Sequence, residues 1–216
     1  MYRRNFLLAL VSLPALLLAA TAAAQEGFTP LFDGQTLSGF ERHNGTATYS
    51  VEEDAIVGRT SEGSGNSFLC TQKEYGDFEL AFEVKVDDPL NSGVQIRSSV
   101  CEKRQGRVHG PQVEIATNGT AGFIYGEALD TGWLSEDRSD EKAQAAFKKG
   151  EWNAYRVVAN GNHIRTWVNG VPVADLNDEK SGMDRGFIAL QVHGIGRGEG
   201  PYEVRWRNLM IKELKR

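Results

Sequence analysis

Three short stretches of the sequence carry polar side chains of the kinds that bind hydroxyl groups and move protons. Residues 91–97, 110–115 and 187–194 each alternate apolar and polar positions with a period of two, as a strand with one buried face does. An ordinary solvent-facing strand is richer in Lys, Thr and Ser than these stretches are. Their polar positions hold Gln95, Arg97, Gln112, Glu114, Gln191 and His193. If the three strands are neighbours, their outward faces form one polar groove.

Three of these residues are candidates for catalysis. His193 is the first choice as a general base, because a histidine ring ordinarily changes its protonation state near pH 6.5; alternatively, it caps a loop before Gly194. Glu114 is a candidate acid or metal ligand, or a solvated strand carboxylate. Arg97 could stabilise an anion through its planar guanidinium, or form a structural ion pair with Glu114.

Further side chains could bind a ligand: Gln95, Gln112, Gln191, Tyr125, Glu127, Trp133 and His109. The glutamines would hydrogen-bond hydroxyl groups, or stitch the sheet face together as a ladder. Aromatic rings stack on sugar rings, although they are as often part of a core. His109 could be a second base, a metal ligand or a loop residue without a functional role. The sequence predicts no metal and no cofactor, and a divalent ion is left open without a tight ligand cluster to bind it.

The elements that must position these residues are short strands joined by Gly, Asn and Asp turns, as in a sandwich or barrel. Residues 78–86 form the clearest strand, with an ordinary charged outer face, and residues 202–214 form another. Asn160-Gly161 and Asn169-Gly170 predict two consecutive hairpins, and Pro172 predicts an edge strand after them. The segment 135–149 alone breaks the pattern, as a short helix or a surface loop.

The first 24 residues have the features of a secretory signal peptide. Two arginines precede an apolar run, and three alanines form a cleavage site before Gln25. Export by the general or the twin-arginine route is therefore expected, followed by a single domain over residues 25–216 without a retained membrane span. The 216-residue sequence has 24 basic residues, two of them in the leader, so 22 remain against 29 acidic residues, a formal charge of −7. This balance argues against nucleic acid as a partner. The sequence does not specify an oligomeric state.

Two cysteines, Cys70 and Cys101, remain after the leader. In an oxidising compartment they could form a disulfide. Two unpaired thiols in the core are the equal alternative.

Short motifs along residues 28–214 resemble a bacterial family described as 3-keto-disaccharide hydrolases. The motifs are Leu31-Phe-Asp-Gly-Gln-Thr-Leu37, Asn66-Ser-Phe-Leu69, Tyr75-Gly-Asp-Phe-Glu-Leu80, Asn91-Ser-Gly-Val94, Trp152-Asn153, Asn169-Gly170, Leu190-Gln-Val-His-Gly194 and Arg207-Asn-Leu-Met-Ile-Lys-Glu-Leu214. The resemblance implies an all-β fold, a concanavalin A-like jelly-roll sandwich of two antiparallel sheets. The signal peptide predicts a periplasmic or secreted location in a bacterium. Pro111 and residues 124–127 depart from one subgroup's pattern, which leaves the exact substrate open.

The resemblance implies a small carbohydrate substrate that carries a ketone at C3 of the sugar. A base would remove the acidified C2 proton, the C1 substituent would leave, and water would add to the enone, which is a net hydrolysis. Direct hydrolysis by two carboxylates is an alternative route. Because fold does not fix function, two rival classes are a non-catalytic carbohydrate-binding module and an interaction domain of an envelope assembly.

Overall fold

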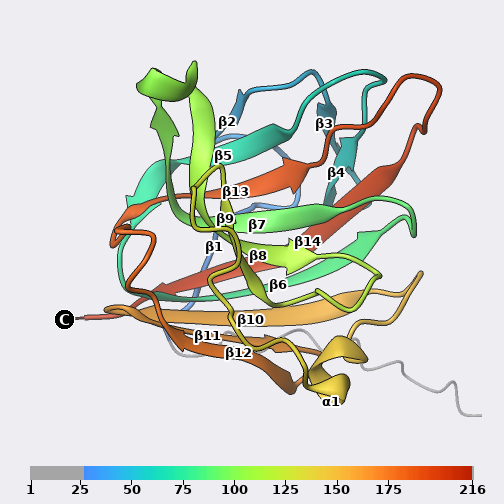
Figure 1. Cartoon of the computed structure of the whole chain (residues 1–216). Helices are drawn as coiled ribbons and strands as arrows, with labels where there is room; N and C mark the ends of the chain where they lie inside the picture. The colour runs from blue at the N-terminus through green and yellow to red at the C-terminus, as the bar shows by residue number, and fades with distance from the viewer. Residues whose placement is uncertain (1–26, 216) are drawn as a thin grey trace, which may run out of the picture.

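A computed structural model describes residues 27–215, which form two antiparallel sheets packed face to face (Figure 1). The predicted signal peptide lies outside these residues. The larger sheet has the order β12-β11-β10-β6-β14-β4-β3, and β1 pairs with β14. Its strands are β1 (Thr29–Pro30), β3 (Thr48–Glu52), β4 (Ala55–Arg59), β6 (Phe78–Val86), β10 (Asn153–Asn160), β11 (His163–Val168), β12 (Val171–Asn177) and β14 (Glu203–Glu213).

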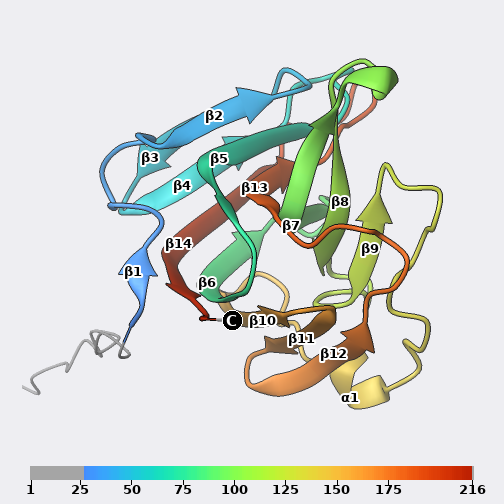
Figure 2. The same cartoon turned by 90° about the vertical axis from the view of Figure 1, so that its left-hand side faces the viewer.

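The smaller sheet has six strands in the order β2-β5-β13-β7-β8-β9. They are β2 (Phe40–His43), β5 (Ser67–Tyr75), β7 (Ser92–Cys101), β8 (Arg107–Ile115), β9 (Ile124–Glu127) and β13 (Gly186–Val192). The all-β jelly-roll sandwich implied by the resemblance is confirmed. Figure 2 shows β7, β8 and β9 side by side, with the 3-10 turn η1 (Glu102–Arg104) at the tip of the β7–β8 hairpin.

The core lies between the two sheets and follows the period-two pattern of the sequence. On β6, alternate residues from Phe78 to Val86 are buried, while Glu79, Glu83 and Lys85 face outward. Their buried partners across the sandwich include Val94, Val113 and Leu190. These three come from the stretches that sequence analysis singled out, so the polar residues between them must face outward from the smaller sheet.

The predicted hairpins are confirmed, with Asn160 paired to His163 and Val168 paired to Val171. The strand that contains Pro172 is the edge strand β12, where a residue without an N–H loses no ladder bond. The segment 135–149 contains one helical turn, α1 (Glu141–Gln144), whose first N–H groups are capped by the Asp140 carboxylate.

Cys70 and Cys101 are both free thiols, so the structure does not contain the disulfide that was one of two expectations. Cys70 lies on β5 and Cys101 at the end of β7, and β13 runs between these two strands. Burial raises the pKa of the Cys70 thiol to about 12. Within residues 27–215, no helix is long and apolar enough to cross a membrane.

Candidate active site

The three polar stretches form neighbouring strands, in the order β13-β7-β8, as their shared character suggested. Their registers place Gln95 opposite Gln112, and place Gly93 between Gln191 on one side and Glu114 on the other. Gly93 has no side chain, and the Gln112 side chain lies over it. A Cβ added at Gly93 would come within 2.5 Å of the Gln112 Cγ and Cδ atoms. The outward face is therefore a continuous polar surface with a shallow floor at Gly93.

A line of hydrogen bonds connects the buried polar residues of this face. The Ser98 hydroxyl donates to Gln95 Oε1 (2.8 Å), and Gln95 Nε2 donates to Gln112 Oε1 (2.7 Å). Gln112 Nε2 then donates to Glu114 Oε1 (2.6 Å). The glutamine ladder that the sequence allowed is present at Gln95 and Gln112, and it ends on a carboxylate.

Glu114 is 5% exposed, and its two carboxylate oxygens accept hydrogen bonds from neutral amides. Gln112 donates to Oε1, and Asn91 Nδ2 donates to Oε2 at 3.1 Å. Burial raises the pKa of Glu114 to about 7, the two amide donors oppose that rise, and the nearby charge of Glu127 adds to it. Glu114 can therefore exchange a proton near neutral pH, which a general acid or base requires.

Glu114 opens onto a groove of about 370 Å³ on the outer face of the smaller sheet. The groove is lined by Asn66, Asn91, Arg107, Gln112, Glu114, Tyr125, Glu127, Trp133 and His193. Tyr125 and Trp133 meet edge to face, with ring centroids 5.3 Å apart. Aromatic faces beside amides and carboxylates are typical of sugar-binding sites. Beyond Asn66, Arg107 and His193, the groove continues into a second hollow of about 550 Å³ that also contains Asn44 and Gln105.

His193 lies on the rim of the groove and is exposed. Its Nδ1 atom lies 2.7 Å from the Gly194 carbonyl oxygen. Since a carbonyl only accepts, Nδ1 carries the hydrogen of the neutral ring, and Nε2 is its basic nitrogen. Sequence analysis proposed a loop cap and a base as alternatives for His193, and this geometry accommodates both.

Glu127 and Arg107 form an ion pair inside the groove, with Arg107 Nη2 3.2 Å from Glu127 Oε1. Asn66 links this pair to the opposite rim, because its Nδ2 lies 3.4 Å from Glu127 and its Oδ1 accepts from the Gly194 N–H at 2.9 Å. Sequence analysis missed Asn66, Asn91 and Arg107 as site residues. Asn66 and Asn91 belong to the family motifs, which was a usable signal, whereas Arg107 sits at a strand start with no pattern around it.

Arg97 does not join the site, and the expectations for it were wrong in two respects. Its φ of +49° interrupts β7, and the β7–β8 register shifts between Gln95 and Ser99. The side chain therefore leaves the face of Gln95, and Ser98 takes its place. The guanidinium donates to the carbonyl oxygens of Gly76 and Gly161 (both 2.7 Å) and to Asp77 (3.0 Å), so its ion pair is with Asp77 and not with Glu114.

Three other candidates lie away from the groove lining, and one of them, Gln95, is the fully buried member of the hydrogen-bond line described above. Gln191 is fully buried on the outer face of β13, next to Gly93, and its amide atoms have no hydrogen-bond partner among the described residues. His109 lies on β8, where its Nε2 is 3.4 Å from the Ser99 hydroxyl. Gln95, Gln191 and His109 are not among the residues that line the groove. In the described part of the chain, no group of three or more His, Cys, Asp or Glu side chains is arranged to bind a metal ion.

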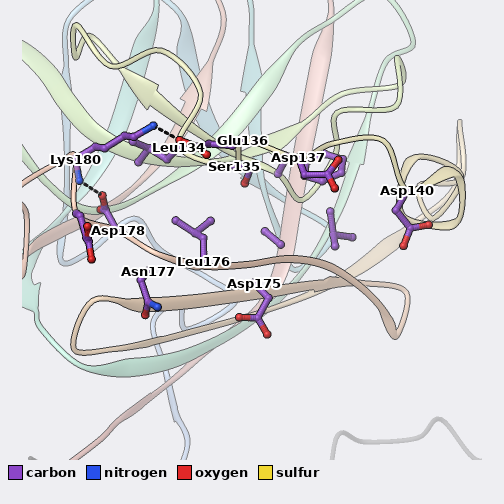
Figure 3. Close-up of a pocket in the computed structure, with 14 residues that line it drawn as sticks. Leu134, Ser135, Glu136, Asp137, Asp140, Asp175, Leu176, Asn177, Asp178 and Lys180 are labelled. Atoms are coloured by element: carbon purple, nitrogen blue, oxygen red, sulfur yellow. Dashed lines mark hydrogen bonds and ion pairs between the residues drawn. The ribbon is translucent and has the colours of Figure 1, made fainter.

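A separate acidic cleft of about 550 Å³ lies between residues 134–140 and β12 (Figure 3). Its carboxylates have local structural partners. Asp140 caps α1, Asp178 accepts hydrogen bonds from Ser181, and Glu136 pairs with Lys180 at 2.5 Å. These contacts stabilise the local turns and leave each of these three carboxylates with a partner. None of the three resembles Glu114, which is buried without a compensating charge. The smaller groove is the better candidate for chemistry.

Comparison with known proteins agrees with the fold. Residues 27–212 match the family described as the 3-keto-alpha-glucoside-1,2-lyase-like domain. The chain belongs to this family. No curated protein matches the sequence.

Solved structures with similar folds include two from Parabacteroides distasonis that are described as proposed glycosyl hydrolases. The first has a TM-score of 0.63 and 20% identity, and the match covers 88% of this chain and 95% of that one. The second has a TM-score of 0.60 and 22% identity, and the match covers 87% of this chain and 99% of that one. Carbohydrate-binding module CBM66 from Bacillus subtilis has a TM-score of 0.54 and 16% identity, with coverage of 81% and 96%. At these identities only the fold is shared. The chain is therefore a jelly-roll domain of the 3-keto-alpha-glucoside-1,2-lyase-like family.

Proposed function

We propose that this chain is an exported enzyme that cleaves 3-keto glycosides, with the groove around Glu114 as its active site. Family membership supports the substrate class. The observation that carries the proposal is the state of Glu114, a buried carboxylate with neutral donors and a pKa of about 7. A module that only binds sugar needs amides and aromatic rings, but it gains nothing from a carboxylate that changes protonation near neutrality.

The reaction begins with proton abstraction at C2, which the adjacent C3 ketone acidifies. Glu114 takes the proton, and the electron pair moves onto the ketone oxygen to form an enolate. The enolate then collapses, the C1–O bond breaks, and the leaving oxygen receives a proton. Addition of water at C1 and return of a proton to C2 complete a net hydrolysis. A base with a pKa near the operating pH suits the first step.

Two other residues of the groove fit the remaining roles. His193 on the rim has Nε2 as its basic nitrogen, which can take a proton from water in the neutral ring and can pass a proton to the leaving oxygen when the ring is protonated. Arg107 supplies the positive charge that an enolate oxygen requires, which was the role first considered for Arg97. Glu127 orients Arg107 through their ion pair. The aromatic pair Tyr125 and Trp133 would contact the sugar ring.

The test is incubation of the purified protein with enzymatically 3-oxidised disaccharides, following the release of the second sugar and any enone absorbance. We expect turnover by the wild type, and a loss of about a hundredfold or more in Glu114→Gln. His193→Ala should lose about tenfold to a hundredfold. A matched control is Glu136→Gln, the same change in the acidic cleft, which should keep wild-type turnover.

The second candidate function is a non-catalytic carbohydrate-binding module, which the shared fold with CBM66 favours. It predicts binding of unoxidised glycans and no turnover of any 3-keto substrate. That pair of results would replace the enzyme proposal. Full activity in Glu114→Gln would instead retain the enzyme and reject Glu114 as its base.

A further inference from the structure

The four residues Ser98, Gln95, Gln112 and Glu114 form a relay, a single line of hydrogen bonds beneath the groove. Its three links are 2.8, 2.7 and 2.6 Å long, and each residue donates toward Glu114. Ser98 and Gln95 are fully buried, and Gln112 and Glu114 are 2% and 5% exposed. The relay starts where Arg97 interrupts β7, so the interruption brings the Ser98 hydroxyl onto this face.

The direction of the relay matches one protonation state of Glu114. A carboxylate accepts hydrogen bonds only, and Gln112 presents its NH₂ group to it. If Gln112 alone turned over, its oxygen would face the carboxylate and its NH₂ would face that of Gln95. Both links would then be lost. When the Ser98 hydroxyl donates to Gln95 Oε1, Gln95 Nε2 faces Gln112 Oε1, and Gln112 Nε2 therefore faces the carboxylate.

The same heavy-atom positions also accommodate the opposite direction. If both amides turn over, a protonated Glu114 donates to Gln112, Gln112 donates to Gln95, and Gln95 donates to the Ser98 oxygen. The Ser98 hydroxyl then needs another acceptor, and the Ile96 carbonyl oxygen lies 3.1 Å away. Every buried polar atom of the relay keeps a partner in either state, so neither state incurs the cost of an unsatisfied group.

We propose that Ser98 and Gln95 are positioning residues for Glu114, and that the relay reverses its direction when Glu114 takes up a proton. This inference rests on the proposed function, in which Glu114 alternates between two protonation states. A ladder that only joins β7 to β8 would have no reason to end on a carboxylate or to offer Ser98 two acceptors.

Other titratable groups lie around Glu114, and among them the charge of Glu127 raises its pKa. Glu127 on β9, His193 beyond β13, and Arg107 and Tyr125 line the same groove. On the inner side, the Tyr155 hydroxyl of β10 donates to the Glu114 backbone carbonyl at 3.3 Å. None of these belongs to the relay, so a change at Ser98 or Gln95 separates its effect from theirs.

The first test is independent of activity. In protein labelled at the Glu carboxyl carbons and Gln side-chain amides, NMR would follow Glu114, Gln112 and Gln95 from pH 5 to 9. We expect the Gln112 and Gln95 amide resonances to move with the Glu114 midpoint, while exposed Gln72 stays unchanged. In Ser98→Ala, the Gln95 response should be reduced. Amide resonances in the wild type that stay fixed through the Glu114 titration would overturn the proposal, whether or not the protein turns over 3-keto glycosides.

The second test uses kinetics to distinguish a role in positioning Glu114 from a purely structural role in joining β7 to β8. Ser98→Ala should lower kcat about fivefold, the effect of about one hydrogen bond, with little change in KM. Ser99→Ala is the matched control, because this neighbouring hydroxyl contacts His109 outside the relay. Equal turnover by the wild type and a folded Ser98→Ala, checked by thermal unfolding, would reject the positioning role. If the wild type has no turnover, the proposed function fails, and the NMR result alone decides on the relay.

Discussion

Arg97 and Glu114 are both buried charged residues on adjacent strands of one sheet, yet their surroundings differ in kind. Arg97 is 1% exposed and has a carboxylate and two backbone carbonyl oxygens as partners. Glu114 is 5% exposed, and its side-chain partners are two neutral amides. Burial thus leaves the charge of Arg97 compensated and that of Glu114 uncompensated.

This difference separates a structural role from a chemical one. A compensated charge keeps its ionisation state and fixes local geometry, here the interruption of β7. An uncompensated carboxylate is costly to ionise, so its pKa rises into the range where protons are exchanged at neutral pH. Residue type alone pointed to both as catalytic, and the partners tell them apart.

The largest expected effect comes from removing the compensated charge. Arg97→Met should lower the free energy of unfolding by about 3–5 kcal/mol, because the buried Asp77 carboxylate loses the guanidinium that lies 3.0 Å away. Urea denaturation at pH 7 measures this. Asp77→Asn in the same background should recover part of the loss. A single variant as stable as the wild type would mean that Arg97 is not a structural residue.

The next largest effect is the change of the unfolding free energy with pH that results from the raised pKa of Glu114. Its pKa is about 7 in the folded protein against an ordinary 4.5, so between these values the unfolded chain releases a proton that the folded protein retains. Stability from this group is complete below pH 4.5 and falls by about 3 kcal/mol as the pH rises through 7. Glu114→Gln removes this loss, so its unfolding free energy relative to wild type should increase from pH 4.5 to 8. Parallel curves for the two proteins would contradict the raised pKa.

The smallest effect is expected where a charge pair is exposed. Lys149 and Asp88 lie 3.2 Å apart, and both side chains are 60% exposed. Because water screens such a pair, Lys149→Ala should change the unfolding free energy by no more than about 0.5 kcal/mol. A loss of several kcal/mol, measured by the same urea titration, would show that partners matter less than the comparison of Arg97 with Glu114 indicates.

Sequence reasoning predicted the parts of this molecule that follow from period and turn chemistry. Alternation identified β6 and the three polar strands, and Asn-Gly pairs placed the hairpins. The adjacency of β13, β7 and β8 was a condition of the predicted site, and it is met.

What sequence reasoning could not predict depends on local breaks and on loops. The positive φ of Arg97 shifts every later residue of β7 by one position, and a regular alternation gives no sign of it. Ser98 therefore escaped notice although it shares a face with Gln95. Arg107 and Asn66 approach the groove from strand ends, where no periodicity assigns a direction to a side chain. Their roles depend on tertiary contacts between distant segments.

Gly93 lowers the stability of the strand β7, but it leaves the space that the Gln112 side chain occupies. Glycine within a strand loses more conformational freedom on folding than any other residue, about 0.5–1 kcal/mol relative to alanine. Any side chain here would meet Gln112 at 2.5 Å and lift the amide away from Glu114. Replacing Gly93 by alanine would therefore reduce the entropy lost on folding, but the added methyl group would displace the Gln112 amide and lower activity.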